Sequence, residues 1–306
     1  MTDGRERGVV EPWPYAGDDA GRIERLGTAH ETRVHADDRS ERHRYRYNRL
    51  GYRGADFDPT AEAHVFVFGE SDAFGAAMDL EDSWPFRFVA RWAASRGLDG
   101  DAVCVSNFAE GAASNAAIAR LTVAQSARIR PDLVLVHFAH FARSEAHVHG
   151  VPVRLWPWID DPAALAQWRS VPRGTRLRAM LDAWHAATVH WTKATSPETQ
   201  VLESLRNMVL VQEFVTARGI PAIATCNHFA RLRQIAAMHP ATLGTLSARL
   251  RDDFVVARTL RDFATDDRRG ADGQHESPAT HEAFAAWMFE RYESLRSEAR
   301  PPPSPP

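Results

Sequence analysis

The chain alternates compact apolar runs with longer amphipathic segments, and this alternation constrains its fold more than any other feature. The first run, HVFVF at residues 64–68, is rich in β-branched and aromatic residues and stops at Gly69, which is typical of a buried strand. Comparable runs predict strands near residues 101–106, 132–138 and 220–225. Helical patterns fall between them, in residues 83–97, 115–130 and 198–219. Strands that alternate with helices indicate parallel βαβ units, and hence an α/β fold whose mostly parallel sheet lies between two layers of helices.

A serine and an Asp-x-x-His pair suggest nucleophilic catalysis by a serine. Ser71 directly follows the first strand, at the edge of the sheet where open α/β folds bind ligands. Asp272 and His275 stand three apart, so on one helical turn or in a tight loop the carboxylate can hold one imidazole nitrogen while the other faces solvent. A serine hydroxyl becomes a nucleophile when such an imidazole accepts its proton. We therefore predict a serine hydrolase in which Ser71 attacks, His275 is the base and Asp272 orients it.

The sequence around these residues resembles the SGNH or GDSL-type hydrolases, whose first block is a strand followed by Gly-Asp-Ser and whose last is Asp-x-x-His. Here the first block reads FGESDAFG, with Glu70 in place of the usual Asp, and the last reads DGQHESPATHEAFA. The resemblance implies a three-layer α/β/α sandwich with a flavodoxin-like sheet. It also implies a carboxylic ester hydrolase. We expect Glu70 to hold the turn by accepting backbone amides.

The two middle blocks of the family concern the oxyanion hole. The segment SNFAEGAASNAAIAR places Gly111 where the family uses a glycine amide as a donor, and its SNxxIxR pattern resembles one bacterial branch. Asn115 in that pattern is close enough in sequence to reach the same pocket. After the third strand the family usually has an oxyanion Asn, whereas this chain has His140 at or near that position. A neutral imidazole donates one hydrogen bond, so the hole either survives with altered strength or is lost.

The branch that shares SNxxIxR implies that the substrate is an O-acyl ester, such as an O-acetyl ester, of a carbohydrate or small metabolite. Three alternatives stay open, of which a metal-dependent hydrolase built on the histidines around the third strand ranks last. An acyltransferase could use the same triad with a sugar hydroxyl in place of water. A catalytically inactive module could bind a glycan or protein, which the changes at Glu70 and His140 would favour.

The chain is predicted to form one hydrolase domain over residues 44–296. Residues 1–43 are dense in charged residues and glycine, which predicts a disordered or extended arm, and the proline-rich residues 297–306 predict a disordered tail. The strand and helix alternation breaks at residues 139–196, which we interpret as an insertion. It either packs on the domain through its tryptophans or forms a wall of the substrate site. Those tryptophans are Trp156, Trp158, Trp168, Trp184 and Trp191.

Several classes of partner and cofactor are not indicated. The net charge of −3, with acidic and basic residues interspersed, argues against a nucleic-acid binder. No Gly-rich nucleotide loop follows a strand, and the GxSxG pattern of the other large hydrolase fold is missing around Ser71. Four histidines gather after the third strand, but they lack the spacing of a zinc motif, so no metal is predicted. These are His137, His140, His147 and His149.

Cysteine usage and the N-terminus favour a cytoplasmic protein. Cys104 and Cys226 are the only cysteines, and both lie in or at the end of strand-like segments, so buried thiols without a disulfide are expected. The first residues lack the pattern of a signal peptide, and no apolar stretch is long enough to span a membrane. The sequence does not indicate an oligomeric state.

Overall fold

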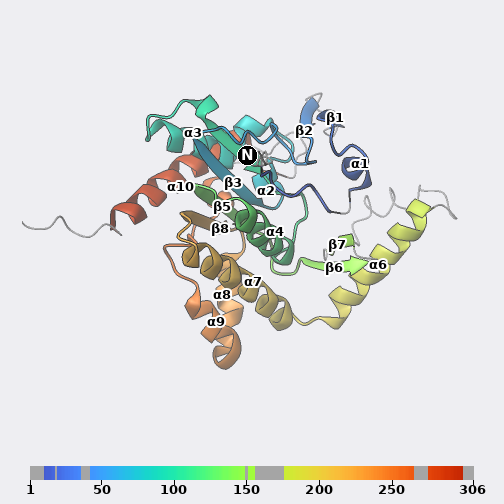
Figure 1. Ribbon diagram of the computed structural model, residues 1–306. Helices are drawn as coiled ribbons and strands as arrows, with labels where there is room; N and C mark the ends of the chain where they lie inside the picture. Colours follow the sequence, from blue (N-terminus) through green and yellow to red (C-terminus); the bar gives the residue numbers. More distant parts are fainter. Residues whose placement is uncertain are drawn as a thin grey trace, which may run out of the picture.

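A four-stranded parallel sheet forms the centre of the computed structural model, which describes residues 10–17, 19–35, 42–148, 151–155, 176–264 and 275–298. The strands are β3 (Ala63–Gly69), β4 (Val103–Asn107), β5 (Leu133–Phe138) and β8 (Ala222–Cys226). Their order is β4-β3-β5-β8, so the chain moves to one side of β3 and then crosses to the other (Figure 1). This is the flavodoxin-like order, which has its topological switch point between β3 and β5. Each predicted strand is confirmed to within two residues.

Helices cover both faces of the sheet, which confirms the three-layer prediction. The helices α3 (Trp84–Ala94) and α10 (Pro278–Glu298) lie on one face (Figure 1). The other face carries α4 (Asn115–Arg128), α7 (Pro197–Ala217) and α8 (Phe229–Met238). Side chains of β3 alternate between the two layers. Val65 and Val67 join the core under α3 and α10, whereas Phe66 and Phe68 join the core under α4, α7 and α8.

Short elements connect these layers. The first turn after β3 is α2 (Ser71–Phe74), and α9 (Thr245–Arg249) follows α8. Three 3₁₀ turns span Leu80–Asp82, Gly100–Ala102 and Leu260–Phe263, and Pro240–Gly244 forms a π turn. Side-chain caps begin the two long helices of one layer: Ser114 accepts from the Ala117 amide at α4, and Ser196 accepts from the Thr199 amide at α7.

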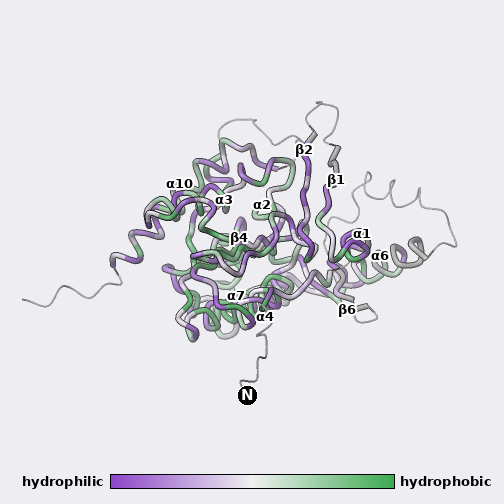
Figure 2. Tube along the Cα trace, turned by 45° about the horizontal axis from the view of Figure 1, so that its top comes forward, coloured by the Kyte–Doolittle hydropathy of each residue, from purple (hydrophilic) through white to green (hydrophobic). Residues whose placement is uncertain are grey.

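The described N-terminal residues contain a short helix and a hairpin and contact the helix α4. After the short helix α1 (Ala20–Ile23), strands β1 (His30–His35) and β2 (Arg42–Tyr47) pair antiparallel. Figure 2 shows that the β2 strand of this hairpin is mostly hydrophilic. Upstream of it, Tyr15 is only 2% exposed, and the Trp13 amide donates to Gln125 Oε1 of α4 at 2.7 Å. The prediction of a disordered or extended arm at residues 1–43 stays a prediction, and the described part of that segment contains α1 and β1.

The described part of residues 139–196, the segment predicted to be an insertion, contains a second hairpin and a long helix. Strands β6 (Ser144–Val148) and β7 (Val151–Leu155) pair antiparallel, and α6 (Arg176–Ala194) extends away from the sheet (Figure 1). Arg120 of α4 joins the hairpin to the domain through an ion pair of 3.0 Å with Glu145. Trp156, Trp158 and Trp168 lie outside the described residues, so the role predicted for the tryptophans stays a prediction.

Both cysteine thiols are buried and free, as predicted. Among the residues that the structure describes, no helix has the length and apolar character needed to cross a membrane.

Candidate functional site

Ser71 lies at the carboxyl end of β3, in a turn that requires a glycine before it. A Cβ atom on Gly69 would come within 2.7 Å of Ala73 Cβ and 2.9 Å of His137 Cβ. Only glycine therefore lets β5 and the first turn of α2 approach each other so closely. The contact brings His137, at the end of β5, beside the turn that carries Ser71.

Glu70 organises this turn. The Ser71 hydroxyl donates to Glu70 Oε2 at 2.8 Å, and Arg143 Nη1 donates to the same oxygen at 2.7 Å. The carboxylate also caps α2 by accepting from the Asp72 amide, as predicted for this residue. Burial alone would raise the pKa of Glu70, but Arg143 and His137 outweigh it and hold that pKa well below its usual range. Glu70 is therefore ionised and is a weak base.

Asp72 is the second buried carboxylate of the turn, and it has the opposite character. Asn227, which follows β8, donates from Nδ2 to Asp72 Oδ2 at 2.5 Å. Burial and the nearby charge of Glu70 raise the pKa of Asp72 to about 7, an effect that His275 opposes. His275 is thus near enough to Asp72 for its charge to act on the carboxylate.

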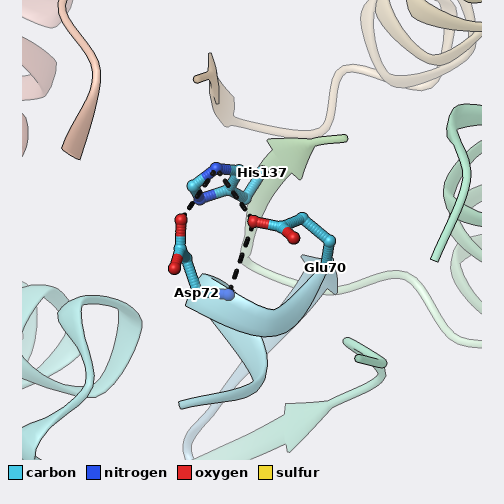
Figure 3. Close-up of side chains that lie close together, drawn as sticks. All are labelled: Glu70, Asp72 and His137. Atoms are coloured by element: carbon cyan, nitrogen blue, oxygen red, sulfur yellow. Dashed lines mark hydrogen bonds and ion pairs between the residues drawn. The ribbon is translucent and has the colours of Figure 1, made fainter. Parts of the chain in front are cut away.

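His137 faces both carboxylates (Figure 3). Its Nε2 atom lies 3.7 Å from Glu70 Oε1 and 3.9 Å from Asp72 Oδ2, and the side chain is completely buried. Neither ring nitrogen has a hydrogen-bond partner among the described residues. Burial lowers the pKa of His137 to about 4, although Glu70 acts in the opposite direction. The imidazole is consequently neutral at pH 7.

The loop after β4 lies against the end of β3, as the predicted oxyanion hole requires. The Glu110 amide donates to the Gly69 carbonyl at 3.0 Å, which places Gly111 one residue beyond that contact. The Gly111 carbonyl accepts from Arg154 of β7 at 2.5 Å. A side chain at position 111 would meet no atom within 4 Å, so this glycine borders open space. The position is compatible with a backbone donor that faces a substrate.

The Asn115 side chain makes three hydrogen bonds within the protein. Its Oδ1 accepts from the Ala139 amide at 2.7 Å, and its Nδ2 donates to the Ala139 carbonyl at 3.1 Å and to Ser204 Oγ at 2.7 Å. Both hydrogens of the side-chain amide are therefore used within the protein. In the structure this residue fastens the segment after β5 to α4 and α7, and its predicted place in the oxyanion pocket stays a prediction.

His140 retains a donor of the kind expected at its position. Its Nδ1 accepts from the Ala142 amide at 3.0 Å, so a neutral ring carries its hydrogen on Nε2. Burial, with the nearby His228 and Arg143, lowers the pKa of His140 to about 3 and keeps the ring neutral. The rings of His140 and His228 lie 4.3 Å apart, edge to face, at the ends of β5 and β8.

Only part of the last sequence block, DGQHESPATHEAFA, lies within the residues that the structure describes. His275 is half-buried just before α10, whereas Asp272 lies outside the described residues. The pairing of Ser71, His275 and Asp272 therefore stays a prediction. His281, six residues after His275, is completely buried and its Nδ1 accepts from the Trp84 amide at 3.0 Å. This bond ties α10 to the start of α3.

Sequence reasoning missed three residues that hold the turn from a distance. Arg143 and Asn227 contact Glu70 and Asp72 across 73 and 155 positions of the chain. Arg53 is 1% exposed and donates to the carbonyls of Phe74 at 2.8 Å and Met78 at 2.7 Å, just after α2. No local pattern marks these contacts, because each joins separate elements.

Comparisons with known proteins give only distant similarity. No protein-family model matches the chain, and no curated protein does so. Similar solved structures include TesA, with 13% identity and a TM-score of 0.43 over 77% of this chain and 98% of that one. Esterase EstA from Pseudoalteromonas sp. has 10% identity and a TM-score of 0.41 over 77% and 97% of the two chains. A family 3 carbohydrate esterase from Clostridium thermocellum has 12% identity and a TM-score of 0.41 over 78% and 99%. At these levels nothing about the chemistry of this site follows from them.

Proposed function

We propose that the protein is a carboxylic ester hydrolase of the SGNH type in which Ser71 forms an acyl-enzyme. The observation that carries the proposal is the position of the Ser71 hydroxyl. It lies at the carboxyl end of β3, beside the switch point of a flavodoxin-like sheet, in a turn fixed by Glu70 and Arg143. Such a turn keeps the hydroxyl in one place, which is what a nucleophile needs.

The base in this proposal is His275, and three other groups near the turn, Glu70, His137 and His140, are too weakly basic to replace it. Glu70 has a pKa well below its usual range because of Arg143 and His137, although its burial acts the other way. Burial lowers the pKa of His137 to about 4 and that of His140 to about 3. None of these groups can take a serine proton efficiently at pH 7. The Ser71 hydrogen would turn from Glu70 to His275, with Asp272 orienting the imidazole.

The oxyanion hole would consist of backbone and imidazole donors. We assign the amides of Ser71 and Gly111 to it, together with Nε2–H of His140, which replaces the side-chain amide that the family usually supplies. The substrate we propose is an O-acyl ester of a carbohydrate or small metabolite. In the first step His275 passes the Ser71 proton to the leaving alcohol as the ester bond breaks. In the second step His275 takes a proton from water, which attacks the acyl group, and returns that proton to Ser71 as the acid leaves.

The test is hydrolysis of p-nitrophenyl acetate by the wild-type protein, Ser71→Ala and His275→Ala. Both variants should lose activity by about 10³-fold or more, because the triad acts as a unit. Ser95→Ala is the matched control, since Ser95 is exposed directly after α3, where its hydroxyl donates to the Trp92 carbonyl and accepts from Arg96. Wild-type turnover no faster than that of Ser71→Ala would contradict the proposal. Acetylated sugars, with and without a second sugar as acceptor, then separate hydrolysis from transfer.

A further inference from the structure

The Glu70, Asp72 and His137 side chains converge at one buried point, where one possible ligand atom of each lies within 4.8 Å of the others. Arg143 reaches Glu70 at Oε2, on the side of the carboxylate that also receives the Ser71 hydroxyl. The other oxygen, Oε1, faces His137 and Asp72 (Figure 3). Two carboxylates and an imidazole nitrogen therefore point toward one another, and the exposed fraction of their side chains is 7% for Glu70, 10% for Asp72 and 0% for His137.

The distances are unsuited to hydrogen bonds and close to those of a metal coordination shell. Nε2 of His137 lies 3.7 Å from Glu70 Oε1 and 3.9 Å from Asp72 Oδ2, beyond the range of an N–H to oxygen hydrogen bond. Ligands about 2.0–2.2 Å from a tetrahedral ion lie about 3.3–3.6 Å from each other. An inward movement of a few tenths of an ångström, ~0.3 Å, would close the shell.

His137 supplies the second, independent observation. A completely buried imidazole whose two nitrogens have no hydrogen-bond partner among the described residues costs stability, because its polar atoms have lost their water. A metal bound to Nε2 would satisfy that atom and the facing carboxylate oxygens at once. Neutral imidazole is also the form that binds a metal.

The surroundings resemble the outer shell of a metal site. Ligating carboxylates in proteins are usually oriented by further hydrogen bonds, and here Arg143 holds Glu70 while Asn227 holds Asp72 at 2.5 Å. Two carboxylates and one imidazole suit Zn²⁺ or Mn²⁺, since imidazole favours the first ion and carboxylates the second.

We propose that Glu70, Asp72 and His137 bind one divalent metal ion, Zn²⁺ or Mn²⁺, beneath the turn that carries Ser71. This inference does not rest on the esterase proposal, because metal binding is measured without any ester. The ion would hold the start of α2, whereas Arg53 holds the end of α2 by donating to the carbonyls of Phe74 and Met78. Its bond to Glu70 Oε1 would leave Oε2 to Ser71 and Arg143.

The experiment uses tag-free full-length protein, stripped with a chelator and dialysed into metal-free buffer. Bound Zn²⁺ and Mn²⁺ are quantified by mass spectrometry after each ion is added back, and affinity is measured by calorimetry. Wild type should bind one ion per chain. Both His137→Gln and Asp72→Asn should bind it at least about 100-fold more weakly, since each loses a ligand. His64→Gln is the matched control, because His64 lies at the opposite end of β3 from Ser71 and should leave binding unchanged.

The outcomes are distinct. Binding of the ion to wild type but not to the two ligand variants supports the site, and Co²⁺ substitution should then give visible absorption bands that the variants lack. Circular dichroism establishes that each variant is folded, and Asp72→Asn preserves the shape of its side chain if His137→Gln does not fold. Stripped wild type that takes up neither ion, or His137→Gln that binds as tightly as wild type, would overturn the proposal. In that case a proton shared by the carboxylates occupies the point.

Discussion

Replacement of Gly69 by Ala tests the close approach on which the site depends. The added methyl carbon would lie 2.7 Å from Ala73 Cβ, 2.9 Å from His137 Cβ and 3.0 Å from the His137 carbonyl oxygen. Favourable carbon contacts are about 3.5–4.0 Å, so the turn and β5 would have to separate by roughly 1 Å. Overpacking of this kind costs about 1–3 kcal/mol, and a displacement of about 1 Å at a nucleophile costs about 10²-fold in rate.

Urea unfolding measures the first effect and ester hydrolysis the second. Gly100→Ala is the control, because a side chain there meets no atom within 4 Å, and its stability should change by less than about 0.5 kcal/mol. The double variant with Ala73→Gly removes the shortest contact but keeps those with His137, so it should recover part of the lost stability. A Gly69→Ala protein as stable as Gly100→Ala would refute the close packing of the turn on β5, whatever the reaction is.

Three further substitutions test other parts of the site. Asn115→Ala leaves the buried Ala139 amide unpaired, so it should lower the free energy of unfolding by about 1–3 kcal/mol in urea, and an unchanged value would contradict the fastening role. His281 is protonated in the unfolded chain below its ordinary pKa of 6.5, whereas burial lowers its folded pKa to about 3. The stability of wild type relative to His281→Gln should therefore fall as the pH is lowered from 6.5 toward 3, by as much as roughly 4 kcal/mol, and a constant difference across urea titrations would exclude this effect. His140→Phe should lower kcat for ester hydrolysis by about 10²- to 10³-fold through loss of an oxyanion donor, while a donor-bearing His140→Asn should recover part of it.

The central sheet could be predicted from the sequence because a parallel strand is buried on both faces. Such a strand reads as a continuous apolar run, and the run at residues 64–68 places β3 almost without ambiguity. The β1–β2 hairpin could not be found in this way. Its second strand, RHRYRY, alternates arginine with histidine or tyrosine, and only the packing of Tyr45 and Tyr47 on the domain reveals it as a strand.

In the candidate site, too, the residues beside a strong strand signal could be predicted, whereas those from distant elements could not. Ser71 and Glu70 are adjacent in sequence to a strong strand signal, so their place at the edge of the sheet and the capping role of Glu70 follow from local pattern. Asn115 is close in sequence to Gly111, as the motif requires. A motif does not say where a side-chain amide points, and here the amide bonds to the backbone of Ala139. The partners of Glu70 and Asp72 come from elements far along the chain, which no local pattern records.

Glu70 stands where the family that the sequence resembles usually has Asp, and the extra methylene group of Glu changes which contacts the carboxylate can make. Its longer side chain lets one carboxylate cap α2, accept from Ser71 and reach Arg143 beyond β5. Arg143 lowers the pKa of Glu70 against the effect of its burial, and the resulting fixed charge of Glu70, together with burial, raises the pKa of Asp72 to about 7. An Asp at position 70 would be one methylene shorter and could not make all three contacts without moving the turn. The charge states of Glu70 and Asp72, on either side of Ser71, therefore depend on the length of the Glu70 side chain and on its contact with Arg143.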